Sequence, residues 1–376
     1  MLESITVQEF HDKMQTNDVF LLDVRATAAY DEWKISGKNI VSVNIQTSKL
    51  KEFGPETYLE LPKDREIIVT CAKGNASREA AQLLREHGYQ AIDLLGGMQA
   101  WSDFYYIVPV VIKPNYTLLQ INRPAKGCLS YMLLSDQQAV VVDPARNEQY
   151  YVNLAKQNNA TITHVFDTHC HADHLSGGLS LAKATDATYA IAAEEMQQST
   201  IPYSPLHDGE TFSVGQTTLE VLAIPTPGHT PGSTSFFIDN SYLLAGDTVF
   251  VSGLGRPDLG GKAQEWAALL YDTVVSQLHQ LNDDVLILPA HYADFREIGS
   301  NGVVGETLLT LRKENELLGN PSDLSSFTQA VTGQLGQTPP NYEKIVQINR
   351  GFIKVSEREA SELEIGPNRC AVKHLP

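Results

Sequence analysis

The chain has 376 residues, of which 42% are hydrophobic and 19% charged, and this composition is typical of folded globular proteins and argues against disorder. Acidic residues outnumber basic ones by 45 to 28, so the net charge of −17 disfavours nucleic acid and anionic membrane surfaces as partners. No apolar run approaches the roughly 20 residues of a membrane span, and the amino terminus lacks the basic and apolar regions of a signal peptide. The four cysteines lie far apart, which favours reduced thiols and a cytoplasmic location over a disulfide framework.

The first hundred residues alternate short apolar runs with helical patterns. Thr6 and Glu9 form a capping-box pattern at the start of a helix that extends to residue 14. Three apolar runs predict buried strands, at residues 19–24, 66–70 and 91–95. An amphipathic helix is predicted at residues 77–87, and Gly88 suits its carboxyl-terminal cap. Strands that alternate with helices predict a mostly parallel α/β sheet.

The pattern changes at residues 105–116, which lack a helical period, contain two prolines and are predicted to form a linker. Further strands are predicted at residues 131–134, 139–142, 164–166, 218–223, 235–238, 242–244 and 285–288. The clearest helix lies at residues 265–281, where apolar residues form one stripe. Two antiparallel-rich sheets with outer helices fit this pattern. The predicted domains are therefore residues 1–104 and 117–351, followed by a tail at 352–376 without an assigned structure.

Cys71 follows a predicted strand, and the next six residues lead into a helix. Backbone N–H groups at a helix N-terminus favour an anion, and Gly74 permits a tight turn, so the loop can cradle a thiolate nucleophile. The residues of this cradle are Lys73, Gly74, Asn75, Ala76 and Ser77. The alternative is a buried, inert cysteine, which is the commoner state of a lone thiol.

The first hundred residues resemble the rhodanese, or sulfurtransferase, family. The resemblance rests on residues 21–25, Tyr30, residues 35–37, the Cys71 loop and residues 95–101. It implies that Cys71 carries a persulfide and passes sulfane sulfur to an acceptor. Many rhodaneses have Arg five residues after the cysteine, where this chain has Ala76, although Lys73 can supply the positive charge instead. This departure weakens the prediction that thiosulfate is the sulfur donor. It weakens the prediction of persulfide chemistry at Cys71 less.

A second group of chemical residues lies in the larger domain. Four potential metal ligands follow one predicted strand, at His169, His171, Asp173 and His174. Three more stand near the ends of later predicted strands, at His229, Asp247 and His291. Imidazole and carboxylate groups suit Zn or Fe, and strand ends converge at one edge of a layered fold. We therefore predict a metal centre rather than independent structural histidines.

These motifs, over residues 117–351, resemble the metallo-β-lactamase superfamily. The resemblance implies an αββα sandwich with the metal at one edge of both sheets. The predicted fold class is thus α/β, an N-terminal rhodanese α/β domain plus an αββα metallo-β-lactamase sandwich. The signature does not specify the reaction, because a fold does not fix a function.

Residues 168–178, 245–248, 255–258 and 287–292 look like the persulfide dioxygenase branch of this superfamily. In that branch one Fe(II) per chain is held by two histidines and an aspartate, and the matching positions are His169, His229 and Asp247. Such a triad leaves open positions for a persulfide and O₂. Arg256 would face the anionic thiol substrate. The other candidate ligands, which are His171, Asp173, His174 and His291, then belong to a second site or support the first.

Two alternatives stay open. A glyoxalase-II-like thioesterase would hold two metals, with Zn as the alternative ion, that share Asp247 and a bridging hydroxide. Its second-site ligands are all present, but the sequence after His291 lacks the pattern of a glutathione-binding helical domain. A non-enzymatic sulfur-relay or sensor protein with a structural metal is the other alternative, and the open coordination expected at the triad argues against it.

The fusion favours the dioxygenase, since an enzyme that consumes R–S–SH and releases sulfite shares its substrate chemistry with a rhodanese. We predict a bifunctional persulfide dioxygenase–sulfurtransferase whose partners are O₂ and a thiol persulfide of glutathione, coenzyme A or a similar thiol, with thiosulfate or sulfite as further partners. The sequence leaves open the identity of the thiol, the direction of sulfur flow and whether the chain forms a homo-oligomer. Cys170 is expected to point away from its neighbouring ligands. Cys128 and Cys370 are expected to be structural or neutral.

Overall fold

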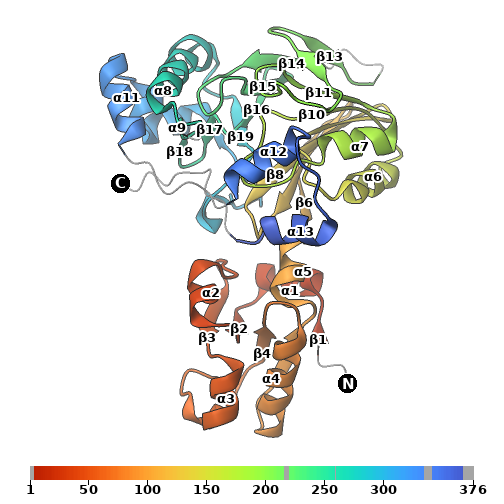
Figure 1. The fold of residues 1–376 in the computed structure, drawn as a ribbon, viewed down its shortest axis with the longest axis vertical. Coiled ribbons are helices and arrows are strands. Elements are labelled where there is room, and N and C mark those ends of the chain that lie inside the picture. The colour runs from red at the N-terminus through yellow and green to blue at the C-terminus, as the bar shows by residue number, and fades with distance from the viewer. Residues whose placement is uncertain (1–3, 216–219, 259, 334–340, 367–376) are drawn as a thin grey trace. The chain divides into compact units, whose positions relative to one another are not determined.

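A computed structural model describes residues 4–215, 220–258, 260–333 and 341–366, which form two compact units (Figure 1). Among the described residues, the first unit holds residues 4–105 together with short segments at Arg123–Lys126 and residues 365–366. The second unit holds most of the remaining chain. Two expectations fall at least partly outside the described residues, namely the structural role of Cys370 and the first two residues of the strand predicted at 218–223.

The first unit is built on a parallel five-stranded sheet with the order β1-β5-β4-β2-β3. Its strands are β1 (Ser4–Ile5), β2 (Val19–Asp23), β3 (Ile40–Asn44), β4 (Ile67–Thr70) and β5 (Ala91–Leu94). Its helices are α1 (Val7–Thr16), α2 (Thr27–Glu32), α3 (Thr47–Phe53), α4 (Asn75–Glu86) and α5 (Gly97–Ser102). Strands β2 and β4 are buried along their whole length, as expected for a parallel sheet covered by helices. The predicted capping box at Thr6 and Glu9 is present.

The second unit is an αββα sandwich. One sheet, in the order β12-β11-β10-β9-β8-β7-β6, contains β6 (Tyr106–Ile112), β7 (Thr117–Arg123), β8 (Cys128–Ser135), β9 (Gln138–Val142), β10 (Thr161–Phe166), β11 (Thr188–Ala192) and β12 (Ser204–Leu206). The other, in the order β13-β14-β15-β16-β19-β20, contains β13 (Thr211–Ser213), β14 (Glu220–Pro225), β15 (Thr234–Ile238), β16 (Tyr242–Gly246), β19 (Leu286–Pro289) and β20 (Glu306–Thr307). A small hairpin joins β17 (Val249–Phe250) to β18 (Gly253–Leu254).

Helices cover both outer faces of this sandwich (Figure 1). They are α6 (Glu148–Gln157) and α7 (Gly178–Thr185) on the seven-stranded sheet, and α8 (Ala263–Asp272), α9 (Leu308–Glu314), α10 (Glu316–Gly319) and α11 (Leu324–Thr332) beside the other sheet. Two further helices follow, α12 (Tyr342–Asn349) and α13 (Glu357–Leu363). One apolar core lies between the sheets, and a second lies between the six-stranded sheet and its helices. The predicted fold class is therefore confirmed.

Three local predictions differ from the structure. Most of the expected linker at residues 105–116 is strand β6, an edge strand paired antiparallel with β7. Its register shifts between Pro109 and Val111, and an edge strand tolerates proline because it needs hydrogen bonds on one side only. The helix predicted at 265–281 is regular only to Asp272 and continues as π and 3-10 turns, where the Thr273 hydroxyl donates to Pro227 O at 2.7 Å. The tail that had no assigned structure contains α13.

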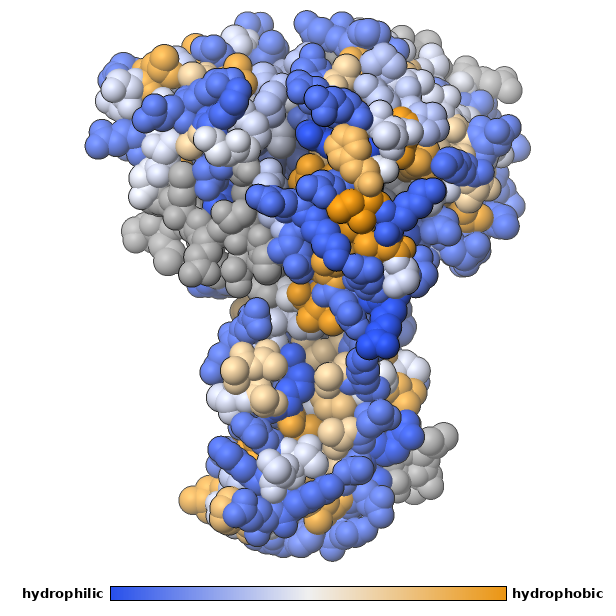
Figure 2. All heavy atoms as spheres, viewed as in Figure 1, coloured by the Kyte–Doolittle hydropathy of each residue, from blue (hydrophilic) through white to orange (hydrophobic). Residues whose placement is uncertain are grey.

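Hydrophilic residues cover most of the face drawn in Figure 2, and apolar residues form smaller patches among them. No helix within the described ranges is both long enough and apolar enough to cross a bilayer.

Candidate functional site

The potential metal ligands of the second unit gather where strands of both sheets end. His169 follows β10, His229 follows β14, Asp247 follows β16 and His291 follows β19. All four side chains are buried, with at most 1% of each exposed. The sequence-based placement of these residues at strand ends therefore brings them together at one edge of the sandwich, as predicted.

Three of these residues, which we call the triad, converge on one point. Oδ2 of Asp247 lies 3.7 Å from Nε2 of His169 and 3.5 Å from Nε2 of His229. None of these three buried atoms has a hydrogen-bond partner among the described residues. Leaving a buried polar atom unpaired costs about 1–3 kcal/mol, so three such atoms facing each other fit a site that holds a cation.

The opposite edges of the triad rings are held in place. His229 Nδ1 lies 3.0 Å from the carbonyl oxygen of Arg256, which can only accept, so this nitrogen carries the proton and Nε2 offers its lone pair. His169 Nδ1 lies 2.9 Å from the Thr168 hydroxyl. Burial lowers the pKa of His229 and, together with the neighbouring His171, lowers that of His169 well below its usual range. Both rings are thus kept neutral, as metal ligation requires.

His171 does not join the triad. Its Nε2 lies 3.1 Å from Oδ1 of Asp143, and its donor atoms group with those of Asp143 and Asp167 instead. Asp143 also accepts hydrogen bonds from the backbone N–H and the hydroxyl of Thr168. His171 thus groups with the carboxylates of Asp143 and Asp167. Its Nδ1 has no hydrogen-bond partner among the described residues.

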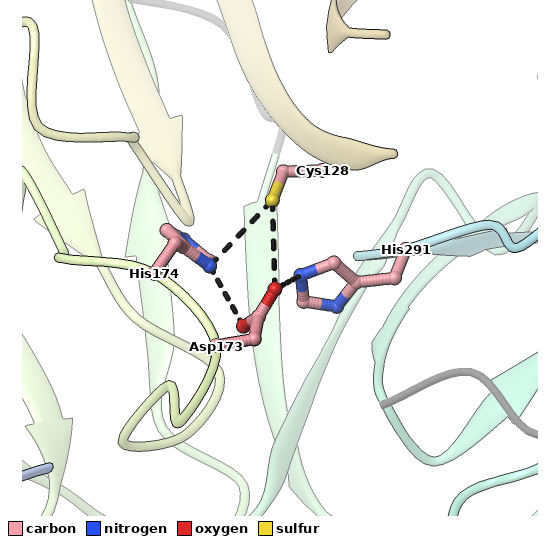
Figure 3. A group of neighbouring side chains, drawn as sticks. All are labelled: Cys128, Asp173, His174 and His291. Atoms are coloured by element: carbon pink, nitrogen blue, oxygen red, sulfur yellow. Dashed lines mark hydrogen bonds and ion pairs between the residues drawn. The ribbon is translucent and has the colours of Figure 1, made fainter. Parts of the chain in front are cut away.

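The remaining candidates, Asp173, His174 and His291, form a second buried cluster that also contains Cys128 (Figure 3). The sequence analysis did not place Cys128 in this cluster, and the expectation that it is structural or neutral stays a prediction. Because β8 runs antiparallel to β9 while β9 and β10 are parallel, the first residue of β8 lies at the edge where β10 ends. Extending the predicted hairpin back to residue 128 would have placed the thiol there.

Charges within this cluster act on one another. Burial alone would raise the pKa of the Cys128 thiol, but His174 and His291 outweigh burial and lower it to about 7. Burial opposes the charge on His174, yet Cys128 and Asp173 raise its pKa to about 10. Cys170 differs, because burial raises the pKa of its thiol to about 12 and its donor atom belongs to no ligand group among the described residues. The Cys170 thiol thus lies outside the ligand groups found among the described residues, and its role as a bystander stays a prediction.

Sequence reasoning missed the residues that hold the ligand loops. Glu195 is buried and accepts hydrogen bonds from the backbone N–H of Cys170 at 2.9 Å and of Gly232 at 2.7 Å, so one carboxylate ties together the loops that carry His169 and His229. An isolated glutamate in a helical or loop pattern gives no sequence signal of such a role.

Residues near the carboxyl terminus hold the loop at residues 169–174, which we call the HCHADH loop, from another side. The side-chain amide of Asn349, at the end of α12, donates to the carbonyl oxygens of His171 and His174 and accepts from the N–H of Ser176. Glu364, which follows α13 and is fully buried, accepts from the N–H of Leu175 and from Arg146. The segment that the sequence left unassigned therefore helps to position the metal ligands.

In the first unit, Cys71 lies between β4 and α4 with its sulfur inside the loop. Its Sγ accepts hydrogen bonds from the N–H of Gly74 at 3.1 Å and from the hydroxyl of Ser77 at 3.2 Å. Gly74 has a φ of +85°, a left-handed conformation that favours glycine. A Cβ at Gly97 would lie 2.2 Å from Cys71 O, so glycine is also needed where the two loops meet. The remaining cradle residues, Lys73, Asn75 and Ala76, keep part of their surface exposed.

Arg256 has a structural partner. Its guanidinium is buried, and Nε and Nη2 each donate to one oxygen of Asp258 at 2.7 Å. The two-pronged geometry is the one expected for strong carboxylate pairing. Arg256 also contributes the carbonyl oxygen that fixes the His229 ring, so its backbone belongs to the site whatever its side chain does.

Two protein families match this chain. The metallo-beta-lactamase superfamily matches residues 123–291, and the rhodanese-like domain matches residues 6–104. Mitochondrial persulfide dioxygenase ETHE1 of Homo sapiens is 31% identical over 179 residues, which cover 46% of this chain and 67% of that protein. Hydroxyacylglutathione hydrolase of Methylococcus capsulatus is 39% identical over 160 residues, which cover 42% of this chain and 57% of that protein.

Solved structures are similar as well. The structure of ETHE1 from Myxococcus xanthus aligns with a TM-score of 0.53 at 25% identity and covers 62% of this chain and 97% of that one. A metallo-beta-lactamase structure from Staphylococcus aureus aligns with a TM-score of 0.59 at 24% identity, covering 65% of this chain and 75% of that one. The second likeness shows the fold alone.

The Glu195 bridge leads to a stability prediction. Glu195→Ala leaves two buried N–H groups unpaired, at about 1–3 kcal/mol each, and we expect a lower melting temperature and a loss of bound metal. Glu194→Ala removes a neighbouring, exposed carboxylate and is the matched control. Thermal unfolding and metal analysis of both variants would measure the difference. Equal melting temperatures and metal contents would show that the bridge does not hold the loops.

Proposed function

Because this chain belongs to the persulfide dioxygenase family of the metallo-β-lactamase superfamily and also carries a rhodanese-like domain, we propose that it oxidises a low-molecular-weight thiol persulfide with O₂ and transfers sulfane sulfur through Cys71. The oxidation balances as R–S–SH + O₂ + H₂O → R–SH + sulfite + 2 H⁺. The substrate is a persulfide of glutathione, coenzyme A or a similar thiol. A reducing, cytoplasmic location suits this chemistry and the free state of Cys71, Cys128 and Cys170.

The observation that carries the proposal is the three-membered donor set. His169, His229 and Asp247 face one another with three unpaired donor atoms. Two histidines and one carboxylate are the ligand set of non-haem Fe(II) oxygenases, and they leave further positions open. Bound Fe(II), one per chain, would supply the activation of O₂ and of the persulfide sulfur. The chain's own contribution is to keep both imidazoles neutral, to fix their ring orientation and to enclose the donors in buried surface.

A binuclear thioesterase is the second candidate, and the similarity to hydroxyacylglutathione hydrolase favours it. Two features of the site speak for the dioxygenase instead. Nε2 of His171 faces Asp143, and the donor group of His169, His229 and Asp247 would hold a first metal with three ligands. In addition, Oδ1 of Asp247 lies 2.6 Å from His291 Nδ1 and accepts a hydrogen bond from it, so this oxygen is not free to bind a second metal.

The sulfurtransferase half of the proposal rests on the Cys71 loop. A sulfur that receives hydrogen bonds from a backbone N–H and a hydroxyl is stabilised as an anion, both as a thiolate and as a terminal persulfide. In the transfer, the Cys71 thiolate attacks the outer sulfur of the donor and releases the donor thiolate. The persulfide sulfur then passes to an acceptor thiolate and Cys71 is regenerated. Lys73, exposed in the same loop, supplies a positive charge for an anionic donor.

The triad generates the first functional prediction. Protein made with ample iron should contain about one Fe per chain, and His169→Ala, His229→Ala or Asp247→Ala should each lose most of it, because each removes one of three ligands. Persulfide-dependent O₂ uptake should fall at least about tenfold in each variant. His207→Ala, at an exposed histidine, is the control and should keep both. Two metals that share Asp247, with thioester hydrolysis and no O₂ uptake, would establish the hydrolase instead.

Cys71→Ser separates the two activities. The variant replaces an ionisable thiol by a hydroxyl that stays protonated at neutral pH, so sulfur transfer to an acceptor thiol should be abolished. Oxygen uptake with a preformed persulfide should stay near the wild-type rate. A loss of both activities in a protein with an unchanged melting temperature would show that the division of labour is wrong.

Arg256 tests the mode of substrate binding. If its guanidinium also binds the anionic substrate, Arg256→Ala should lower kcat/KM about ten- to a hundredfold with iron retained. This range corresponds to the loss of one charged hydrogen bond, which is worth about 1.5–3 kcal/mol. Arg256→Lys keeps the charge but loses the fork and should fall between. Asp258→Asn breaks the same ion pair from the other side and is the matched control. Unchanged kinetics with a lower melting temperature in all three variants would assign Arg256 to the structural pair alone.

A further inference from the structure

A buried carboxyl group in the first unit has no part in the function proposed above. Asp93 stands on β5 with only 2% of its surface exposed. Neither of its side-chain oxygens has a hydrogen-bond partner among the described residues. Buried carboxylates are normally hydrogen-bonded, because an ionised group without partners is costly to remove from water. The isolation of this side chain therefore needs a physical explanation.

The strand register directs Asp93 toward the helix that follows the Cys71 loop. Side chains alternate along a strand, so Asp93 shares a face of the sheet with Ala91. Ala91 packs in one apolar core with Ala81 of α4, and α4 contacts β5. Ser77 lies in the first turn of the same helix and has no exposed surface. Asp93 and Ser77 thus meet between the sheet and α4.

Ser77 connects Asp93 with the reactive sulfur. Its hydroxyl donates to Cys71 Sγ at 3.2 Å. It is also near enough to Asp93 that, turned toward the carboxyl, it would lower the pKa of that group. A serine hydroxyl carries one proton, so it can donate to the sulfur or to the carboxylate but not to both.

The surroundings of Asp93 favour the protonated form of its carboxyl group. Burial raises the pKa of Asp93. The Ser77 hydroxyl and the guanidinium charges of Arg78 and Arg85 oppose this rise without cancelling it. Nε of Arg78 lies 3.8 Å from Oδ2 of Asp93, beyond hydrogen-bond distance, and the Arg78 side chain is 69% exposed, so water screens this ion pair. Asp93 therefore keeps its proton to a higher pH than an exposed aspartate does.

We propose that Asp93 is a positioning residue for the sulfur-transfer site and controls whether the Ser77 hydroxyl donates to the Cys71 sulfur. As an acid, Asp93 donates its own proton to Ser77 Oγ, and the Ser77 hydroxyl then donates to the sulfur anion. Once Asp93 is ionised, its carboxylate accepts the Ser77 proton. The sulfur then keeps the N–H of Gly74 and loses the hydroxyl. The inference rests on the proposed role of Cys71 as the sulfur carrier, whose anionic states these donors stabilise.

Asp93 and Cys71 should accordingly lose their protons in coupled steps. When the pH rises, ionisation of Asp93 removes the Ser77 hydrogen bond from the sulfur and adds a like charge near it, and both changes oppose formation of the thiolate. Cys71 should therefore become reactive over a broader pH range than a single thiol does. Asp93→Asn fixes the neutral state, because the amide NH₂ can donate to Ser77 Oγ as the acid does.

The test measures the rate at which iodoacetamide alkylates Cys71 in the full chain as a function of pH, with the Cys71 peptide quantified by mass spectrometry. The wild-type profile should rise in two steps. Asp93→Asn should give a single step about one pH unit lower, which is roughly tenfold faster alkylation below the wild-type midpoint. Glu79→Gln removes an exposed carboxylate from the same helix and should reproduce the wild-type profile.

Ser77→Ala separates the effect of the hydroxyl from the effect of the charge. If Asp93 acts through Ser77, the shift caused by Asp93→Asn should largely disappear in the Ser77→Ala background. An equal shift in both backgrounds would show that the charge alone acts and would overturn the proposal. Circular dichroism shows whether each variant is folded.

The wild-type profile needs no variant, and a single step in it would overturn the proposal even if a substitution unfolds the chain. Alkylation does not require sulfur transfer. A one-step profile in a chain that transfers sulfur would therefore remove the role of Asp93 and leave the proposed function intact. A two-step profile in a chain that transfers no sulfur would refute the sulfurtransferase proposal and leave the coupling of Asp93 to Cys71.

Discussion

The Asp247 carboxylate is the group on which both ligand clusters depend. Its two oxygens have different partners, since Oδ2 faces His169 and His229 while Oδ1 accepts a hydrogen bond from His291. A buried carboxylate held through Oδ1 is restricted in rotation, so the free lone pairs of Oδ2 stay directed at the point where the triad converges. Burial would favour protonation, but the nearby His291 outweighs burial and lowers the pKa of Asp247, which keeps the carboxylate anionic.

The loops around Asp247 are fixed by backbone hydrogen bonds to buried side chains rather than by secondary structure. Glu195 joins the two loops that carry the triad histidines, and Asn349 holds the HCHADH loop by its carbonyl groups. Glu364 completes this support from the carboxyl-terminal segment. Buried backbone groups in loops need such partners because water cannot reach them. The helices α12 and α13 therefore contribute to the metal centre although they contain no ligand.

The two units use polar groups in opposite ways, one to stabilise an anion and the other to favour a cation. In the first unit, a backbone N–H and a hydroxyl stabilise a sulfur atom at the start of α4. In the second unit, neutral imidazoles and a carboxylate leave their lone pairs unpaired and so favour a cation. In the reaction proposed above, persulfide sulfur would use both environments, one to store it as an anion on a protein thiol and one to oxidise it at a metal. The combination of the two domains in one chain is consistent with a shared sulfur substrate.

The sequence by itself singled out most of the candidate site residues and the elements that present them. Motif spacing located Cys71, the triad and the second-site ligands, and alternating apolar runs placed each of them at the end of a strand, because local patterns encode local structure. The pairing of strands and the packing of helices decided which distant residues meet at the site. The antiparallel register of β8 brought Cys128 to His291, and α12 and α13 brought Asn349 and Glu364 to the ligand loop. Residues more than 150 positions apart meet only through tertiary packing, and no local pattern records such a contact.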